Sequence, residues 1–210
     1  LGMLDALVAV QAGDLVAINL QMRPDHCDEK RKEIQVFGPS LLSFCTVNRA
    51  YIIDLHALAS EQLDQKLCWL IQNLPLTFCA FSAPCLINYF REFLPEFQFL
   101  RYVPNLMDVK IGYSRVKSTP GKNFSMVHYL LFGQRYSPVV TNWDKRPLHD
   151  NQIKTAALEA QVLLRMAYKI RFMASYGIEG HPRMFPPQIC YSVHDFALQM
   201  GYKQHFMRKK

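Results

Sequence analysis

The longest regular pattern of apolar and polar positions lies in the second half of the chain. Between residues 153 and 170 the apolar side chains recur at i, i+3, i+4 and i+7, the spacing of one face of an amphipathic helix. Pro147 precedes this segment, where proline can begin a helix but cannot continue one. The pattern therefore predicts a helix of about five turns whose apolar face packs on a sheet or on a second helix layer. Its inward positions are Ile153, Ala156, Ala157, Ala160, Leu163, Leu164, Ala167 and Ile170.

Shorter apolar runs, rich in branched and aromatic residues and bounded by turn residues, predict β-strands in the first half. Strands are predicted at residues 15–20, 41–47, 51–54, 76–81 and 97–103. Helical spacing predicts further helices at 60–73, from 84 to about 93, at 106–109, 124–132 and 192–200. The charged residues between 25 and 33 predict an exposed hairpin loop.

Three early strands joined by short turns, followed by alternating helices and strands, favour an α/β fold. We expect a mixed five-stranded sheet with helices on both faces. The length of 210 residues predicts a single domain. The chain begins abruptly, so a fragment of a longer protein is an open alternative.

Composition and charge add little to this prediction. The net charge of +7 favours a polyanionic partner, although many basic domains bind no nucleic acid. No apolar run approaches a membrane span, and no secretory leader is visible at the N-terminus.

The six cysteines contain no C-x-x-C pair, and most have apolar neighbours, which predicts buried, reduced thiols in an intracellular protein. A zinc site at His26 and Cys27 is an alternative that the spacing does not support. The cysteines are Cys27, Cys45, Cys68, Cys79, Cys85 and Cys190.

A motif surrounds the start of the long helix. Residues 142–148 read NWDKRPL, Gln152 follows, and residues 155–160 read TAALEA. This segment resembles the last motif of the RNase D-like 3′–5′ exonucleases, and most of all that of the Werner-type and Nibbler-like exoribonucleases. In that family the motif reads roughly W-x-x-R-P-L, a Gln, then Y-A-A-x-D-A. The resemblance covers about residues 14–172, leaves 173–210 as a C-terminal extension, and implies a ribonuclease H-like layout.

The resemblance also implies an active site of four carboxylates and a tyrosine around two divalent ions. Residues 18–24, INLQMRP, resemble the family's I-D-x-E-W-x-P, so amides replace the first two carboxylates. At the remaining positions the chain has a thiol, a hydroxyl and one longer carboxylate. These five altered positions are Asn19, Gln21, Cys85, Thr155 and Glu159.

Neutral amides are poor ligands for hard dications, so we expect no two-metal site, no cofactor and no hydrolysis, which would make the chain a non-enzyme. The open alternative is an active 3′–5′ exoribonuclease with non-standard metal ligands. Asp54 and Asp108 lie at the ends of elements, and we expect them to cap these rather than replace metal ligands.

The resemblance implies a scaffold that contacts protein partners, with RNA and homodimerisation as further options, in a small-RNA silencing pathway. The expected location is cytoplasmic or nuclear, with a ribonucleoprotein granule as one option. C-terminal aromatics are candidate partner contacts, although folding back on the core is the favoured alternative: Phe185, Tyr191, Phe196, Tyr202 and Phe206. The candidate RNA phosphate contacts, each of which is alternatively a solvated surface cation, are Lys110, Arg115, Lys117, Lys122, Lys145 and Arg146.

Overall fold

The computed structural model describes most of the chain between residues 14 and 191. The described ranges are 14–22, 38–58, 61–74, 76–95, 97–103, 105–121, 123–137, 142–143, 145–176 and 190–191. The charged loop at 25–33, the pair His26 and Cys27, Lys122 and the predicted helix at 192–200 lie outside these ranges. None of the helices in the described ranges is long and apolar enough to cross a membrane.

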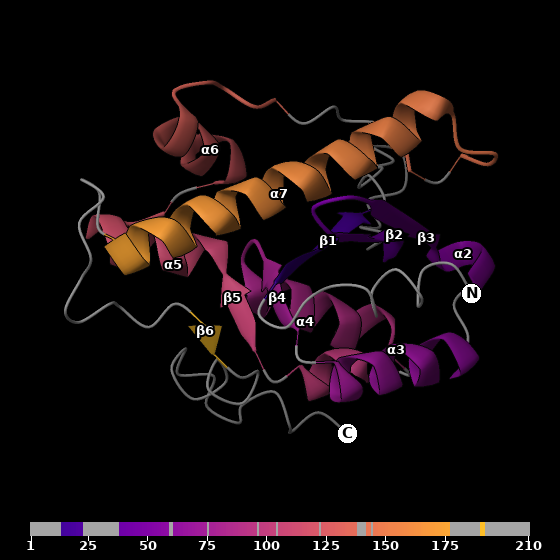
Figure 1. Cartoon of the computed structure of the whole chain (residues 1–210). Coiled ribbons are helices and arrows are strands. Elements are labelled where there is room, and N and C mark those ends of the chain that lie inside the picture. The colour runs from indigo at the N-terminus through magenta and orange to yellow at the C-terminus, as the bar shows by residue number, and fades with distance from the viewer. Residues whose placement is uncertain are drawn as a thin grey trace, which may run out of the picture.

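A mixed sheet forms the centre of the fold, with the order β3-β2-β1-β4-β5-β6 (Figure 1). β1 pairs antiparallel with β2 and parallel with β4, and β4 pairs parallel with β5. A two-residue strand, β6, adds an edge to the predicted five. The strands are β1 (Leu15–Met22), β2 (Pro39–Cys45), β3 (Ala50–Asp54), β4 (Thr77–Ala80), β5 (Leu106–Asp108) and β6 (Cys190–Tyr191).

Helices cover both faces of this sheet, as the sequence predicts. α7 runs along one face with α5 beside it, and α3 and α4 lie against the other (Figure 1). The helices are α2 (Leu55–Leu58), α3 (Glu61–Asn73), α4 (Ala83–Phe93), α5 (Val109–Lys117), α6 (Phe124–Phe132) and α7 (Asp150–Tyr176), with a 3₁₀ helix, η1, at Phe99–Tyr102.

The alternation of side chains along β1 determines which layer each residue joins. Val16 and Ile18 are buried in the core beneath α3 and α4. Leu15 and Ala17 are buried in the core beneath α5 and α7. Because a strand has a period of two, the next odd-numbered residue, Asn19, also belongs to the α7 side.

α7 extends the predicted long helix at both ends, to twenty-seven residues. Most of the predicted inward positions are buried, including Ala156, Ala160 and Leu163. Ile153 is an exception, since 42% of its side chain is exposed. The apolar stripe of α7 thus begins to contact the core at Ala156.

Two predictions of secondary structure are wrong: one predicted strand is a 3₁₀ helix, and one predicted helix is a strand. The fifth strand was expected at 97–103, but η1 lies there, and Gln98 and Phe99 donate their backbone N–H groups to Oδ1 of Asp64 at 2.8 and 3.0 Å. The segment predicted helical at 106–109 instead supplies β5, which pairs with β4 from Leu106 onwards. A run of buried apolar residues does not distinguish these conformations, and the long-range partner decides between them.

Candidate functional site

Two amide side chains project from β1 toward α7. Asn19 is half-buried, and Gln21 is only 6% exposed. The two-residue spacing places both on the same face of the strand, as the sequence predicts. Backbone pairing with Ser43 and Leu41 of β2 fixes their positions in the middle of the sheet.

α7 brings one carboxylate to these amides. Gln21 donates from Nε2 to Oε2 of Glu159 at 2.5 Å, and Asn19 donates from Nδ2 to the same oxygen at 3.3 Å. The three side chains come from positions 138 and 140 residues apart in the chain. We call Asn19, Gln21 and Glu159 the Glu159 cluster.

The carboxyl group of Glu159 is less acidic than usual. Burial raises its pKa, because the ionised form loses contact with water, while the hydrogen bonds from Gln21 and Asn19 act in the opposite direction. The cluster therefore contains a single negative charge that is already disfavoured by its surroundings. This differs from a site in which several carboxylates meet.

A tyrosine that the sequence analysis did not identify lies close to Glu159. Burial raises the pKa of Tyr136 to about 12, and the charge of Glu159 adds to this shift. The Tyr136 ring packs on Phe124 and His128, with ring centroids 5.6 and 5.8 Å apart. Phe124 in turn meets Phe81 at 5.3 Å, so half-buried rings continue from the end of β4 to the neighbourhood of Glu159.

Cys85 and Thr155 make other contacts. Cys85 lies in the first turn of α4 and is exposed, contrary to the expectation of a buried thiol, and its Sγ is 3.6 Å from the hydroxyl of Ser82. The Thr155 hydroxyl donates to the backbone carbonyl of Asn151 at 2.7 Å. The structure thus joins Asn19, Gln21 and Glu159 in one hydrogen-bonded cluster and gives the other two altered positions separate contacts.

Asp108 holds the turn that leads into α4. Its side chain is 1% exposed and accepts from the backbone N–H of Ala83 at 2.7 Å. It also caps α5 through the N–H groups of Lys110 and Ile111, at 2.8 and 3.1 Å. Burial raises the pKa of Asp108, although these backbone donors favour the charged form. Asp108 acts as the expected cap.

Asp54 lies at the end of β3, where it caps as expected and also forms an ion pair that the sequence did not predict. Its Oδ1 accepts from the backbone N–H of His56 at 3.0 Å. Its principal partner is Arg146, whose hydrogen bonds hold the pKa of the Asp54 carboxyl below its usual range.

The predicted RNA contacts that lie within the described ranges occupy two regions, α5 and the segment before α7. Lys110, Arg115 and Lys117 belong to α5, and Lys145 is exposed before α7. Arg146 has a structural role, because its five N–H donors are all used within the protein. Arg146 therefore has no N–H donor left for an RNA phosphate, contrary to the expectation from the sequence.

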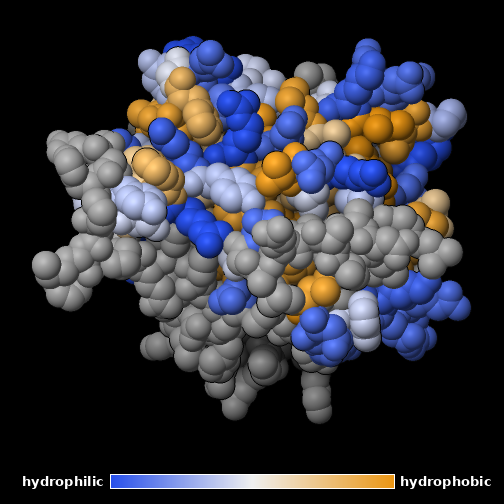
Figure 2. All heavy atoms as spheres, viewed as in Figure 1, coloured by the Kyte–Doolittle hydropathy of each residue, from blue (hydrophilic) through white to orange (hydrophobic). Residues whose placement is uncertain are grey.

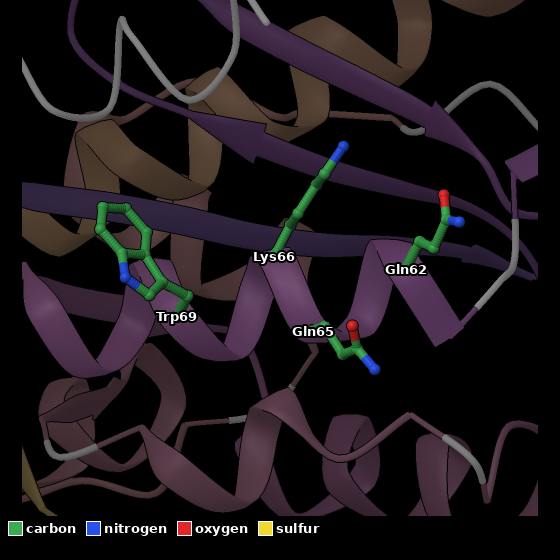
Figure 3. A pocket seen from close by; sticks show the side chains of 4 residues that line it. All are labelled: Gln62, Gln65, Lys66 and Trp69. Atoms are coloured by element: carbon green, nitrogen blue, oxygen red, sulfur yellow. The ribbon is translucent and has the colours of Figure 1, made fainter.

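Two pockets lie away from the Glu159 cluster. One, of about 250 Å³, is lined by Gln62, Gln65, Lys66 and Trp69, which all project from α3 (Figure 3). The other, of about 420 Å³, lies between the β2–β3 turn and α7.

The donor set of the Glu159 cluster does not fit a pair of divalent ions. It offers one carboxylate and two neutral amides, which is too little negative charge for two dications at close range. Within the described ranges, no group of three or more His, Cys, Asp and Glu side chains is placed to hold a metal ion.

Comparison with solved structures identifies the fold. The EXO domain of Aedes aegypti Nibbler matches with a TM-score of 0.65 and 20% identity, over 81% of this chain and 82% of that one. The chain has the fold of an RNase D-like 3′–5′ exonuclease domain. Escherichia coli RNase D matches with a TM-score of 0.61 and 16% identity, over 81% of this chain and 41% of that one. No family model and no curated protein matches the sequence.

A structure of Trypanosoma brucei RNase D in complex with the RNA U12 matches over 98% of this chain and 68% of that one, with a TM-score of 0.62 and 14% identity. These likenesses establish the exonuclease-like fold expected from the sequence. The chain spans less than half the length of the Escherichia coli enzyme.

The comparisons contradict the expectation of a non-enzyme. Escherichia coli RNase D is an exoribonuclease, and another match is the catalytic core of RRP6 from Trypanosoma brucei. The prediction that this chain is not an enzyme is therefore wrong. It inferred the absence of an activity from five altered positions, whereas the structures that share the fold include exoribonucleases.

Proposed function

We propose that this chain binds single-stranded RNA, with the strand passing the Glu159 cluster. The observation that carries the proposal is the hydrogen bonding of one Glu159 carboxylate by the neutral amides of Asn19 and Gln21. A surface with several carboxylates and no metal would repel the phosphates of RNA. Here a single carboxyl with a raised pKa faces them, so the repulsion is smaller.

Aromatic rings next to the cluster support the same function. Single-stranded nucleic acids bind to half-exposed rings because every base has a face that can stack. Tyr136 and Phe124 are half-buried, so part of each ring is open to a ligand. A solved structure of similar fold, that of Trypanosoma brucei RNase D, is a complex with the RNA U12, which further supports RNA as a ligand.

Positive charge on α5 and before α7 supplies phosphate contacts in this proposal. Lys110 and Lys117 are half-buried on α5, and Lys145 is exposed. Contacts of this kind release counterions, so the affinity should fall steeply as salt is added. The net charge of +7 has the sign that a polyanion requires.

Fluorescence anisotropy with a labelled U12 RNA tests the proposal. We expect binding in low salt that weakens linearly on a plot of log affinity against log salt concentration. Lys145→Glu should weaken it, whereas Lys66→Glu, the same change of charge on α3, should not. Binding that is absent in low salt, or equally sensitive to both substitutions, would contradict the proposal.

A second candidate function is 3′–5′ exoribonuclease activity with non-standard ligands. Glu159 retains a carboxylate beside β1, and solved structures of the same fold include exoribonucleases. Incubation of labelled single-stranded RNA with Mg²⁺ or Mn²⁺ separates the two candidates. Shortening of the RNA from its 3′ end that Glu159→Ala abolishes would establish the second; binding without shortening would favour the first.

The cellular setting follows from the resemblance alone. We propose that the domain acts in a small-RNA silencing pathway in the cytoplasm or nucleus, where it also contacts protein partners or a second copy of itself. Recovery of RNA after crosslinking in cells would test this setting. Recovery of long messenger RNA without small RNA or its targets would contradict it.

A further inference from the structure

The pocket of about 420 Å³ lies on the flank of α7 that faces away from Glu159. One wall is the turn between β2 and β3, and the other is a stripe of α7 with helical spacing. Thr155 and Glu159 belong to the opposite flank of the same helix. The lining residues are Cys45, Thr46, Val47, Asn48, Arg49, Ala50, Lys154, Ala157, Leu158 and Gln161.

Large aliphatic side chains are exposed on both walls. Val47 on the turn is 65% exposed, and Leu158 on α7 is 50% exposed. Figure 2 shows apolar surface over the N-terminal half of α7, with hydrophilic side chains around it. Apolar surface with a polar rim is typical of a site that another chain covers.

The charged side chains in the described lining of the pocket are all positive. Arg49 and Lys154 are the charged residues among the described residues that line it, and none of these described residues is a carboxylate. Among the described residues neither forms an ion pair, whereas Arg146 pairs with Asp54 at the other end of β3. A ligand that supplies carboxylates to both cations would therefore complement the pocket.

The turn is already held in shape. Thr46 donates its backbone N–H to the carbonyl of Arg49 at 2.8 Å, and its hydroxyl bonds to both the carbonyl and the N–H of Arg49 at 3.2 Å. Because this wall is already ordered, the protein loses less conformational entropy when a ligand binds to it.

The lining favours a peptide over RNA. Single-stranded RNA binds largely by stacking on aromatic rings, and none of the described residues that line this pocket is aromatic. Aliphatic side chains beside cations suit a leucine or isoleucine flanked by acidic residues. We propose that the pocket between the β2–β3 turn and α7 docks an acidic, leucine-containing segment of a partner protein.

A labelled peptide tests this docking site. The probe is a fluorescein-labelled dodecapeptide in which two leucines are flanked by aspartates and glutamates, measured by anisotropy with the full chain. We expect Arg49→Glu and Lys154→Glu each to weaken binding at least tenfold. Lys169→Glu on α7 makes the same change of charge outside the pocket and should leave binding within twofold. Circular dichroism verifies that each variant is folded.

Two further measurements give the proposal a definite outcome. In ¹⁵N spectra of the labelled protein, the peptide should shift the amide signals of residues 46–50 and 154–161. Replacing the two leucines with asparagines should weaken the peptide at least fivefold. The docking proposal would be overturned if Lys169→Glu weakened peptide binding as much as the pocket variants do, or if the asparagine peptide bound as tightly as the leucine peptide. It would also be overturned if Arg49→Glu lost U12 RNA binding but kept peptide binding.

Discussion

Arg146 holds the carboxylate of Asp54 with two parallel hydrogen bonds, from Nε to Oδ2 at 2.6 Å and from Nη2 to Oδ1 at 2.8 Å. The residues are 92 positions apart, so this pair fixes the segment before α7 to the end of β3. The other guanidinium donors bind the Trp143 carbonyl at 2.6 Å, the Lys145 carbonyl at 3.0 Å and the Ser40 hydroxyl at 3.1 Å. Lysine cannot reproduce this planar arrangement.

We predict that Arg146→Lys lowers the free energy of unfolding by about 1–3 kcal/mol, because charge-assisted hydrogen bonds are lost and the Trp143 carbonyl loses a donor. Arg146 also lowers the pKa of Asp54, so this stabilisation is present above the ordinary pKa of an aspartate and is lost as the pH falls through the lowered value. Urea unfolding at neutral and acid pH measures both effects. If the difference in free energy of unfolding between the variant and wild type grew in acid, this would contradict the pairing of Arg146 with Asp54.

Asp108→Ala should be more damaging. The side chain is buried and accepts backbone N–H groups from Ala83, Lys110 and Ile111, which would be left without their acceptor. An unpaired buried donor costs about 1–3 kcal/mol, and only the Ala83 hydrogen bond is fully buried, whereas those of Lys110 and Ile111 are partly buried and cost less; we therefore expect a total loss of about 2–4 kcal/mol. Asp108→Asn keeps one carbonyl acceptor and should lose less. Thermal unfolding of both variants measures this order, and equal losses would contradict the capping role.

Local patterns predicted much of the site because its members follow regular periods. Asn19 and Gln21 share a face of β1 by the period of a strand, and Glu159 lies on a predicted helix, so their meeting follows from packing that helix on that strand. Tyr136 was missed because it lies in the loop between α6 and α7, where no period indicates its direction. Only the tertiary structure brings its ring to Glu159.

The errors in the fold have a similar origin. The segment 97–103 is apolar, and its conformation is decided by Asp64, a carboxylate more than thirty positions earlier that accepts from Gln98 and Phe99. Arg146 appears in the sequence as one of several cations before a helix. Its ion pair with Asp54 is a long-range contact that local spacing cannot predict.

Glu159→Gln should stabilise the protein at neutral pH. Burial raises the pKa of Glu159, so the folded state favours the protonated group, and stability decreases as the pH rises from the ordinary pKa through the raised value. Glutamine has nearly the shape of protonated glutamate and removes this cost. The melting temperature of the variant should exceed that of wild type at neutral pH, and the difference should shrink in acid. A lower melting temperature at neutral pH would show that the ionised carboxylate stabilises the cluster.

Tyr136→Ala should weaken the binding of U12 RNA by about 1–3 kcal/mol, roughly fivefold to a hundredfold, because it removes a stacking face. Tyr136→Phe keeps the ring and loses only the hydroxyl, whose pKa of about 12 means that it is protonated at neutral pH. The phenylalanine variant should therefore bind within about twofold of wild type if the ring supplies the affinity. Tyr89→Ala removes an exposed ring from α4 and serves as the matched control.

Anisotropy titrations at one low salt concentration compare wild type with these three variants. Equal weakening by Tyr136→Phe and Tyr136→Ala would assign the affinity to the hydroxyl, and unchanged binding in both would remove Tyr136 from the RNA site.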